Sequence, residues 1–171
     1  MKDDPTAGVV REAVFDRSGR YRYVLSRQWP RGEGRAVFIM LNPSTADGER
    51  DDPTIRRCMG FAHDWGFARL EVLNLFAFRA TRPEQLKQAR RPVGPANDRH
   101  LRRSVKDARL VLLAWGIHGP WQGRDAEVLR LLRKEHCAPA CLGRTAGGHP
   151  RHVLYLPRHL RPESFGPGGL G

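Results

Sequence analysis

The chain has 171 residues, of which 40% are hydrophobic, and its 30 basic and 18 acidic side chains give a formal net charge of +12. This length suits one domain with a single core, and no apolar stretch approaches the roughly 20 residues of a membrane-spanning helix, which argues against a membrane protein. The charge attracts polyanions and predicts nucleic acid as partner, although arginine-rich solvated helix faces would give the same charge. The first residues, MKDDP, form no apolar signal segment, so we expect a cytoplasmic protein. We also expect a monomer.

The first third of the chain predicts an N-terminal β-hairpin, within residues 1–30. Residues 9–15 and 21–25 are strand-like, and the sequence DRSG between them is a turn signal. Residues 36–41, AVFIML, form a continuous apolar run. Such a run is typical of a strand that is buried on both faces of a parallel sheet.

Strands and helices then alternate along the chain. A helix is expected to begin at Asp52, with Pro53 in its first turn, and to end at Gly66. Further strands are expected at residues 70–76, 110–115 and 140–142, and further helices at 83–89, from a cap at Asn97 or Asp98 to 108, and at 125–136.

This alternation predicts an α/β fold. We expect a three-layer sandwich with a central, mostly parallel four-stranded sheet flanked by helices, plus the N-terminal hairpin. No linker or internal repeat divides the sequence, so residues 1–171 are expected to form one domain. Residues 162–171 are rich in glycine and proline and are expected to form a loose tail.

The cysteines and acids favour structural roles over a metal site. Cys137 and Cys141 have C-x-x-x-C spacing, and a zinc site there would need His149 and His152 as further ligands. Cys141 lies in an apolar run and is expected to be a small core residue. The acids of residues 47–52 are expected to cap a helix and solvate a loop. We expect no metal and no cofactor, and no G-x-G-x-x-G or Walker A pattern indicates nucleotide binding.

Polar residues follow each predicted buried strand. In open parallel sheets, ligands bind beyond the carboxyl ends of the strands. The residues expected at that edge are Asn42, Ser44, Asn74, His118, His149 and His152.

The two asparagines suggest a site that recognises a polar, uncharged group. Pro43 restrains Asn42, whose amide could orient a water molecule or read a nucleobase edge, although a plain turn is the alternative. Asn74 interrupts an apolar strand. A buried, unpaired amide costs about 1–3 kcal/mol, so either the fold or a ligand must supply partners for Asn74.

Three motifs carry a resemblance to known families. FIMLNPS at residues 38–44, VLNLFAFRATRPEQL at 72–86 and HPRHVLYLP at 149–157 resemble, in order, motifs of the uracil-DNA glycosylase superfamily. Residues 36–157 also resemble a bacterial family of unknown function that has N-P-S-T-A, D-D-P-T and P-R-H-x-L-Y segments.

The glycosylase resemblance implies a role for each matching residue. Asn42 would orient the hydrolytic water, and Asn74 would hydrogen-bond the edge of a flipped base. His152 would stabilise the departing base anion, with His149-Pro150 as a competing alignment. Ser44 and Phe61 are further candidates for base binding, and DNA contacts are expected from Arg79, Arg144 and Arg151.

The resemblance implies a DNA glycosylase-like hydrolase that removes uracil, hypoxanthine or xanthine from single- or double-stranded DNA. Two alternatives remain open, a non-catalytic nucleic-acid-binding module on the same fold and a hydrolase of free nucleotides or nucleosides. Asn42 stands where the most active branch of the superfamily has aspartate, so Asn42→Asp is expected to raise the rate for uracil.

Overall fold

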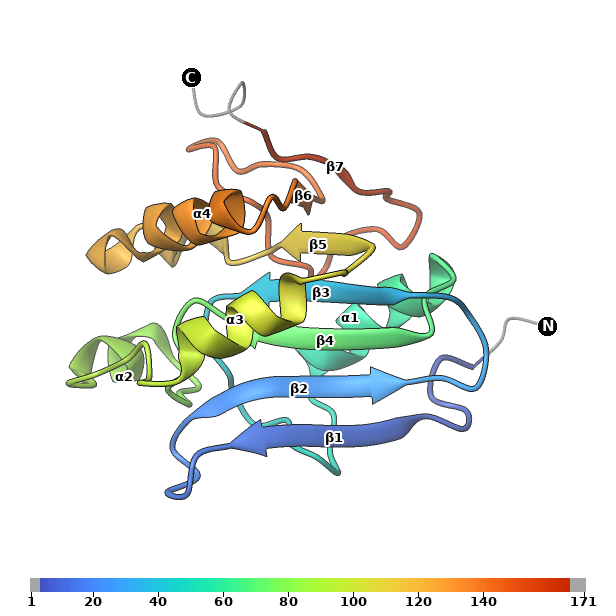
Figure 1. The fold of residues 1–171 in the computed structure, drawn as a ribbon, viewed down its shortest axis with the longest axis horizontal. Coiled ribbons are helices and arrows are strands. Elements are labelled where there is room, and N and C mark those ends of the chain that lie inside the picture. The colour runs from blue at the N-terminus through green and yellow to red at the C-terminus, as the bar shows by residue number, and fades with distance from the viewer. Residues whose placement is uncertain (1–3, 167–171) are drawn as a thin grey trace.

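The computed structural model describes residues 4–166, which form one mixed sheet with helices on both faces (Figure 1). The strands are β1 (Val10–Phe15), β2 (Arg22–Gln28), β3 (Arg35–Met40), β4 (Arg69–Asn74), β5 (Leu110–Leu113), β6 (Ala140–Cys141) and β7 (Glu163–Ser164). The helices are α1 (Pro53–Asp64), α2 (Pro83–Gln88), α3 (Asn97–Val105) and α4 (Arg124–Lys134), with short 3-10 turns η1 (Gly116–His118) and η2 (Trp121–Gly123).

The sheet has seven strands in the order β1-β2-β4-β3-β5-β6-β7. Neighbours are parallel from β4 through β3 and β5 to β6, whereas the pairs β1/β2, β2/β4 and β6/β7 are antiparallel. The mixed α/β class is therefore confirmed. The prediction of a four-stranded sheet is wrong, because the hairpin and the C-terminal segment join the same sheet through main-chain pairing.

Two apolar cores lie on opposite faces of the sheet. The first, which we call the α3/α4 core, packs the two helices of that name against residues such as Ile39, Leu73 and Leu113. The second, the α1 core, packs helix α1 against residues such as Phe38 and Val72. Figure 1 shows α3 and α4 in front of the sheet and α1 behind it. Alternating residues of the central strands thus face different helices, which explains why their sequences are apolar throughout.

The C-terminal segment departs from the expected loose tail. Glu163 and Ser164 pair with β6, and Phe165 is 4% exposed within the α3/α4 core. Residues 162–166 are therefore ordered against the sheet, and residues 167–171 lie outside the described part of the chain. Cys141 is buried in the α3/α4 core, as predicted.

Helix α3 begins differently from the prediction. Asn97 and Asp98 lie inside its first turn, and Ala96 occupies the capping position without a side-chain hydrogen bond. Asn97 is fully buried, and its Nδ2 atom donates instead to the carbonyl oxygens of Asn74 and Leu75 at 2.9 and 3.1 Å. Over residues 4–166, the helices are all too short or too polar to cross a membrane.

The start of helix α1 matches the prediction and provides a test of the cap. Asp52 Oδ1 accepts a hydrogen bond from Ile55 N at 2.8 Å, and Pro53 occupies the first helical position. We expect Asp52→Ala to lower the free energy of unfolding by about 1 kcal/mol in urea titrations, because the helix loses its cap. Asp52→Asn keeps the capping oxygen but replaces the oxygen that accepts Ala46 N with an NH2 group, so it should cost less than Asp52→Ala. Equal losses in both variants would show that the cap itself contributes little.

Candidate functional site

A cleft of about 430 Å³ lies at the carboxyl ends of three parallel strands. Met40 and Asn42 line it from the end of β3, Asn74 from the end of β4, and Trp115 and His118 from the segment after β5. In chain order the parallel strands are β3, β4, β5 and β6, and their spatial order reverses between β3 and β5. Such a reversal is the topological switch point, at which open α/β sheets bind ligands.

The turn after β3 holds Asn42 in one orientation. The amide Nδ2 donates to Pro43 O at 3.1 Å and to Ala80 O at 2.7 Å. The second bond ties this turn to the segment that follows β4. Because both amide hydrogens are used on carbonyl groups, Oδ1 is the atom of Asn42 that remains for a ligand or a water molecule.

Asn74 is the most informative residue of the cleft. It is the last residue of β4, pairs with Met40 in the ladder and is 1% exposed. Neither Nδ2 nor Oδ1 has a hydrogen-bond partner among the described residues. Because Val72, two residues earlier, packs in the α1 core, Asn74 lies on that face of the sheet. The fold therefore leaves a buried amide unpaired at the floor of a cleft, where a ligand could supply its partners.

A β-bulge directs Arg22 to the same face. Val14 pairs with Val24 and Phe15 with Arg22, so Tyr23 has no partner in the ladder. Tyr23 and Val24 both pack in the α3/α4 core, and Arg22 turns to the other face, where its Nη1 donates to Ala46 O at 3.0 Å. Bulges often aim a side chain in this way next to a functional site.

The charge of Arg22 is held in an unfavourable setting. Arg22 is 2% exposed, and its Nε atom has no partner in the described residues. Burial lowers the pKa of its guanidinium to about 10, and the attraction of Asp52 offsets part of this effect. Asp52 also lines the cleft, and both of its carboxylate oxygens accept backbone N–H groups, from Ile55 and Ala46.

The segment after β5 adds two ring side chains. Trp115 is 2% exposed, and its Nε1–H has no acceptor in the part of the chain that is described. Gly119 packs so closely on the indole that an added Cβ would lie 2.3 Å from Cδ1 of Trp115. His118 lines the cleft from η1 and is partly exposed.

The loop after β6 brings His152 to the cleft. Gly116 N donates to Pro150 O at 2.9 Å, which anchors this loop to the end of β5. Leu154 N donates to Nδ1 of His152 at 3.1 Å, so the neutral imidazole carries its proton on Nε2. His149 does not line the cleft; its main-chain N–H donates to Thr145 Oγ1 in a tight turn. Of the two histidine candidates, only His152 lies in the cleft.

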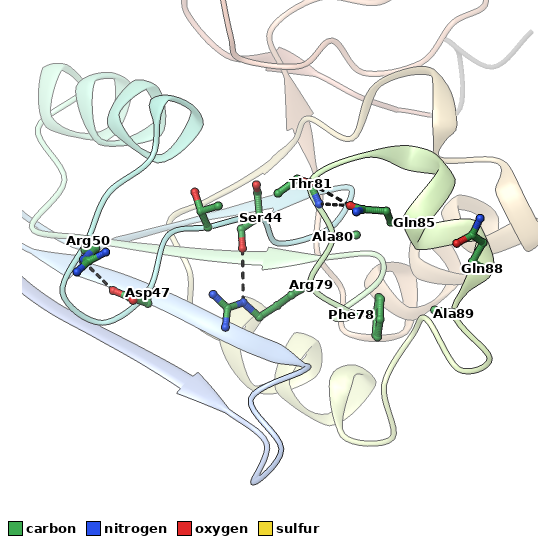
Figure 2. A pocket seen from close by; sticks show the side chains of 11 residues that line it. Ser44, Asp47, Arg50, Phe78, Arg79, Ala80, Thr81, Gln85, Gln88 and Ala89 are labelled. Atoms are coloured by element: carbon green, nitrogen blue, oxygen red, sulfur yellow. Dashed lines mark hydrogen bonds between the residues drawn. The ribbon is translucent and has the colours of Figure 1, made fainter.

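A second cavity, of about 770 Å³, adjoins the cleft and shares Ser44, Ala80 and Thr81 with it. We call this cavity the groove. Figure 2 shows Arg79 directed at the carbonyl of Ser44, a contact of 3.5 Å, and Gln85 bonded to Thr81 at the start of α2. The groove is open and of mixed polarity, which suits a flexible polar chain better than a compact apolar ligand.

Several predicted site residues lie elsewhere. Phe61 is completely buried in the α1 core against Trp65, so the prediction that it stacks on a ligand is wrong. Arg144 stacks on Phe165 with its guanidinium carbon 4.0 Å from the ring centre. Arg151 is exposed and lies outside the cleft lining, so its predicted DNA contact stays a prediction. Arg79 lines the groove, but its guanidinium also covers the Phe15 ring at 5.0 Å.

The acids of the loop before α1 are used within the fold. Asp51 forms ion pairs with Arg11 and with the buried Arg27 at 2.9 and 2.8 Å. Asp47 Oδ1 accepts the main-chain N–H groups of Glu49 and Arg50. Between residues 4 and 166, no group of three or more His, Cys, Asp or Glu side chains is arranged to hold a metal ion.

Sequence reasoning missed Arg22 and Trp115. Arg22 stands at the start of a predicted hairpin strand, where an arginine is expected to be exposed. The sequence shows only that a charged residue follows the DRSG turn closely. Nothing in the sequence indicates the bulge that turns Arg22 inward. Trp115 ends an apolar run, so it is indistinguishable from a core residue by pattern.

The protonation of His152 provides a test of this geometry. His152 is exposed at the rim of the cleft, and the neighbouring atoms that partly desolvate its ring lower its pKa below the usual 6.5, a shift that the attraction of Asp52 partly opposes. We therefore expect the titration midpoint of its Cε1–H resonance to fall below 6.5, whereas a short peptide of residues 150–154 should titrate at the usual value. Since the unfolded chain binds this proton more readily, protonation of His152 should cost stability as the pH falls below 6.5. A midpoint at or above 6.5 would contradict the placement of the ring.

Comparison with known proteins gives one family. No curated protein and no solved structure matches the chain. The model of the family described as "Protein of unknown function (DUF1643)" matches residues 22–154. These limits coincide with Arg22 and Leu154, the first and the last residues that line the cleft. Because the match covers well over half of its length, the chain belongs to the DUF1643 family of proteins of unknown function.

Proposed function

We propose that the cleft holds a nucleobase and that the protein is a DNA glycosylase-like hydrolase, which removes a deaminated base from DNA. The observation that carries this proposal is the unpaired amide of Asn74, buried at the floor of a cleft at the switch point of the sheet. An amide presents one donor and one acceptor side by side, which complements a ring carbonyl next to a ring N–H. Uracil, hypoxanthine and xanthine all have that pair.

The other cleft residues fit the needs of glycosidic cleavage. Breaking the bond between sugar and base leaves negative charge on the base, which donors aimed at the base stabilise. The Nε2–H of neutral His152 can serve as such a donor, and His152 lines the cleft. Trp115 also lines the cleft, but its ring packs in the α3/α4 core. Asn42 Oδ1 can orient the water that attacks the sugar.

The dimensions and the charge are also consistent with an extruded nucleotide. A glycosylase must take its base out of the stack, so it needs a pocket of about one base and a surface for the strand. A cleft of about 430 Å³ that opens beside a groove of about 770 Å³ offers both. The net charge of +12 favours contact with phosphate groups.

The first test uses labelled oligonucleotides that contain uracil, hypoxanthine or xanthine, followed by alkali to cleave abasic sites. We expect the protein to produce abasic sites in the oligonucleotides that carry at least one of these three bases. Asn74→Asp should lower the single-turnover rate roughly 10- to 100-fold and change the order of preference, because a carboxylate cannot donate to a ring carbonyl. Gln122→Glu makes the same chemical change at an exposed residue that does not line the cleft, and it should leave the rate unchanged.

Two other results would favour the alternative functions. Salt-sensitive DNA binding without any abasic site would indicate a non-catalytic binding module. Release of bases from mononucleotides but from no oligonucleotide would indicate a nucleotide hydrolase. The same cleft could hold a base in all three functions, so activity assays are needed to distinguish them.

Asn42 provides a further test, and its contacts reverse the expectation from sequence. In Asn42→Asp, a carboxylate oxygen would replace Nδ2 and face the carbonyl oxygens of Pro43 and Ala80. We expect this substitution to lower the free energy of unfolding by about 1–3 kcal/mol in urea titrations and to leave the glycosylase rate no higher than that of the parent protein. A faster variant would show that water activation by a carboxylate outweighs the lost contacts.

A further inference from the structure

We infer that Arg22 is a specificity residue of the cleft and that, with Asn74, it selects ring edges in which two carbonyl groups flank an N–H group. This inference rests on the proposed nucleobase site and names its substrate class. Uracil and xanthine present such an edge. Hypoxanthine has one carbonyl and a C–H group in place of the second, so it would leave Arg22 without an acceptor.

The first step is the placement of Arg22 beside Asn74. Strand β2 runs antiparallel to β4, so the first residue of β2 lies at the edge of the sheet where β4 ends. The bulge at Tyr23 turns Arg22 to the α1 face, which Asn74 also occupies. Both residues line the cleft and both are at least 98% buried.

The second step is the unused side of the guanidinium. Nη1 is bonded to Ala46 O, whereas Nε is buried and unpaired, and no bond to Nη2 is found among the described residues. Nε–H and Nη2–H together form the side-on fork of an arginine, which binds a pair of acceptor lone pairs. Within residues 4–166, Asp52 forms no ion pair with Arg22 that would occupy these two N–H groups. Asp52 is nevertheless the acid with the largest effect on the pKa of Arg22.

The third step is a comparison with the two other fully buried arginines. Arg27 directs Nε to Asp51 at 2.8 Å, and Arg124 directs Nε to Leu75 O at 2.8 Å. Their forks are completed by Asp47 O and by Asp98, respectively. These arginines are structural, and the fold supplies their acceptors. Arg22 alone of the three lines the cleft and lacks an acceptor at Nε.

Chemical complementarity then defines the ligand. Asn74 Nδ2–H can donate to one ring carbonyl while Oδ1 accepts the ring N–H, and the Arg22 fork can donate to the second carbonyl. Exocyclic amino groups, as in cytosine and adenine, would meet donors instead of acceptors. A base without the second carbonyl would leave the buried, charged Arg22 donor unpaired. Such a site therefore discriminates strongly against that base.

Binding of free bases tests this without requiring catalysis. Isothermal titration calorimetry with uracil, xanthine and hypoxanthine should give affinities for the first two that exceed that for hypoxanthine by about tenfold or more. Arg22→Lys keeps the charge but lacks the fork, and it should reduce this ratio to about two or less. Arg27→Lys makes the same change at a buried arginine outside the cleft and should preserve the ratio.

A second measurement keeps the test valid if Arg22→Lys does not fold. In the ¹⁵N spectrum of the unaltered protein, the Nε–H resonance of Arg22, assigned through its own side chain, should shift with uracil and xanthine but not with hypoxanthine.

Different failures have different meanings. Equal affinities for all three bases, or an Arg22 resonance that no base moves, would overturn the role of Arg22 while the nucleobase site stands. Absence of binding by every base, together with absence of abasic sites in every oligonucleotide, would overturn the proposed function and this inference with it.

Discussion

The carbonyl groups at the carboxyl end of β4 are held by two buried side chains, and the shape of the cleft depends on these contacts. Asn97 Nδ2 donates to the carbonyls of Asn74 and Leu75, and Arg124 Nε donates to the latter at 2.8 Å. Arg124 is fixed in turn by Asp98 and Glu127. A strand that ends in the interior must find partners for its carbonyls, because unpaired buried groups are costly. Here helices α3 and α4 supply them from the far face of the sheet, so the main chain of Asn74 is fixed while its side chain stays unpaired on the other face.

The polar groups of this protein thus fall into two classes. Most of those that shape the fold have partners, as in the loop before α1, where Arg27 binds Asp51 and two main-chain carbonyls. Exceptions away from the cleft are Asn97 Oδ1 and the Nε atoms of Arg35 and Arg57, which are buried without a hydrogen-bond partner among the described residues. Those of the second class, the side chains of Arg22, Asn74 and Trp115, are buried at one cleft and have unpaired donors in the described residues. Local conflicts of this kind are expected where function, rather than stability, has selected the residue.

Much of the architecture follows from local sequence rules. The AVFIML run, the Asp52-Pro53 helix start and the polar residues after each apolar run predicted β3, α1 and the edge at which the cleft lies. What failed depends on tertiary context. The second hairpin strand was predicted to stand beside the sheet, yet β2 lies inside it. Its arginines Arg22 and Arg27 can be buried there because the loop before α1 supplies acceptors for them. Asn97 was predicted as a helix cap because asparagine favours caps. In the structure its side chain instead donates to the carbonyl oxygens of Asn74 and Leu75 at the end of β4. Phe61 has no sequence signal that separates a core ring from a ligand-stacking ring.

The distribution of acids constrains how the proposed reaction would proceed. Asp52 is the single carboxylate among the described cleft residues, and two main-chain N–H groups already bind its oxygens. Both oxygens are thereby engaged in holding the loop before α1 and the start of that helix. Asn42 is neutral and anchored by its NH2 group, so it can orient water but cannot deprotonate it. Catalysis in such a cleft would therefore depend mainly on stabilising the departing base, with the N–H donors of Arg22 and His152 acting on its developing charge. A leaving group whose negative charge spreads over two carbonyl oxygens gains most from those donors, so recognition and catalysis would draw on the same contacts.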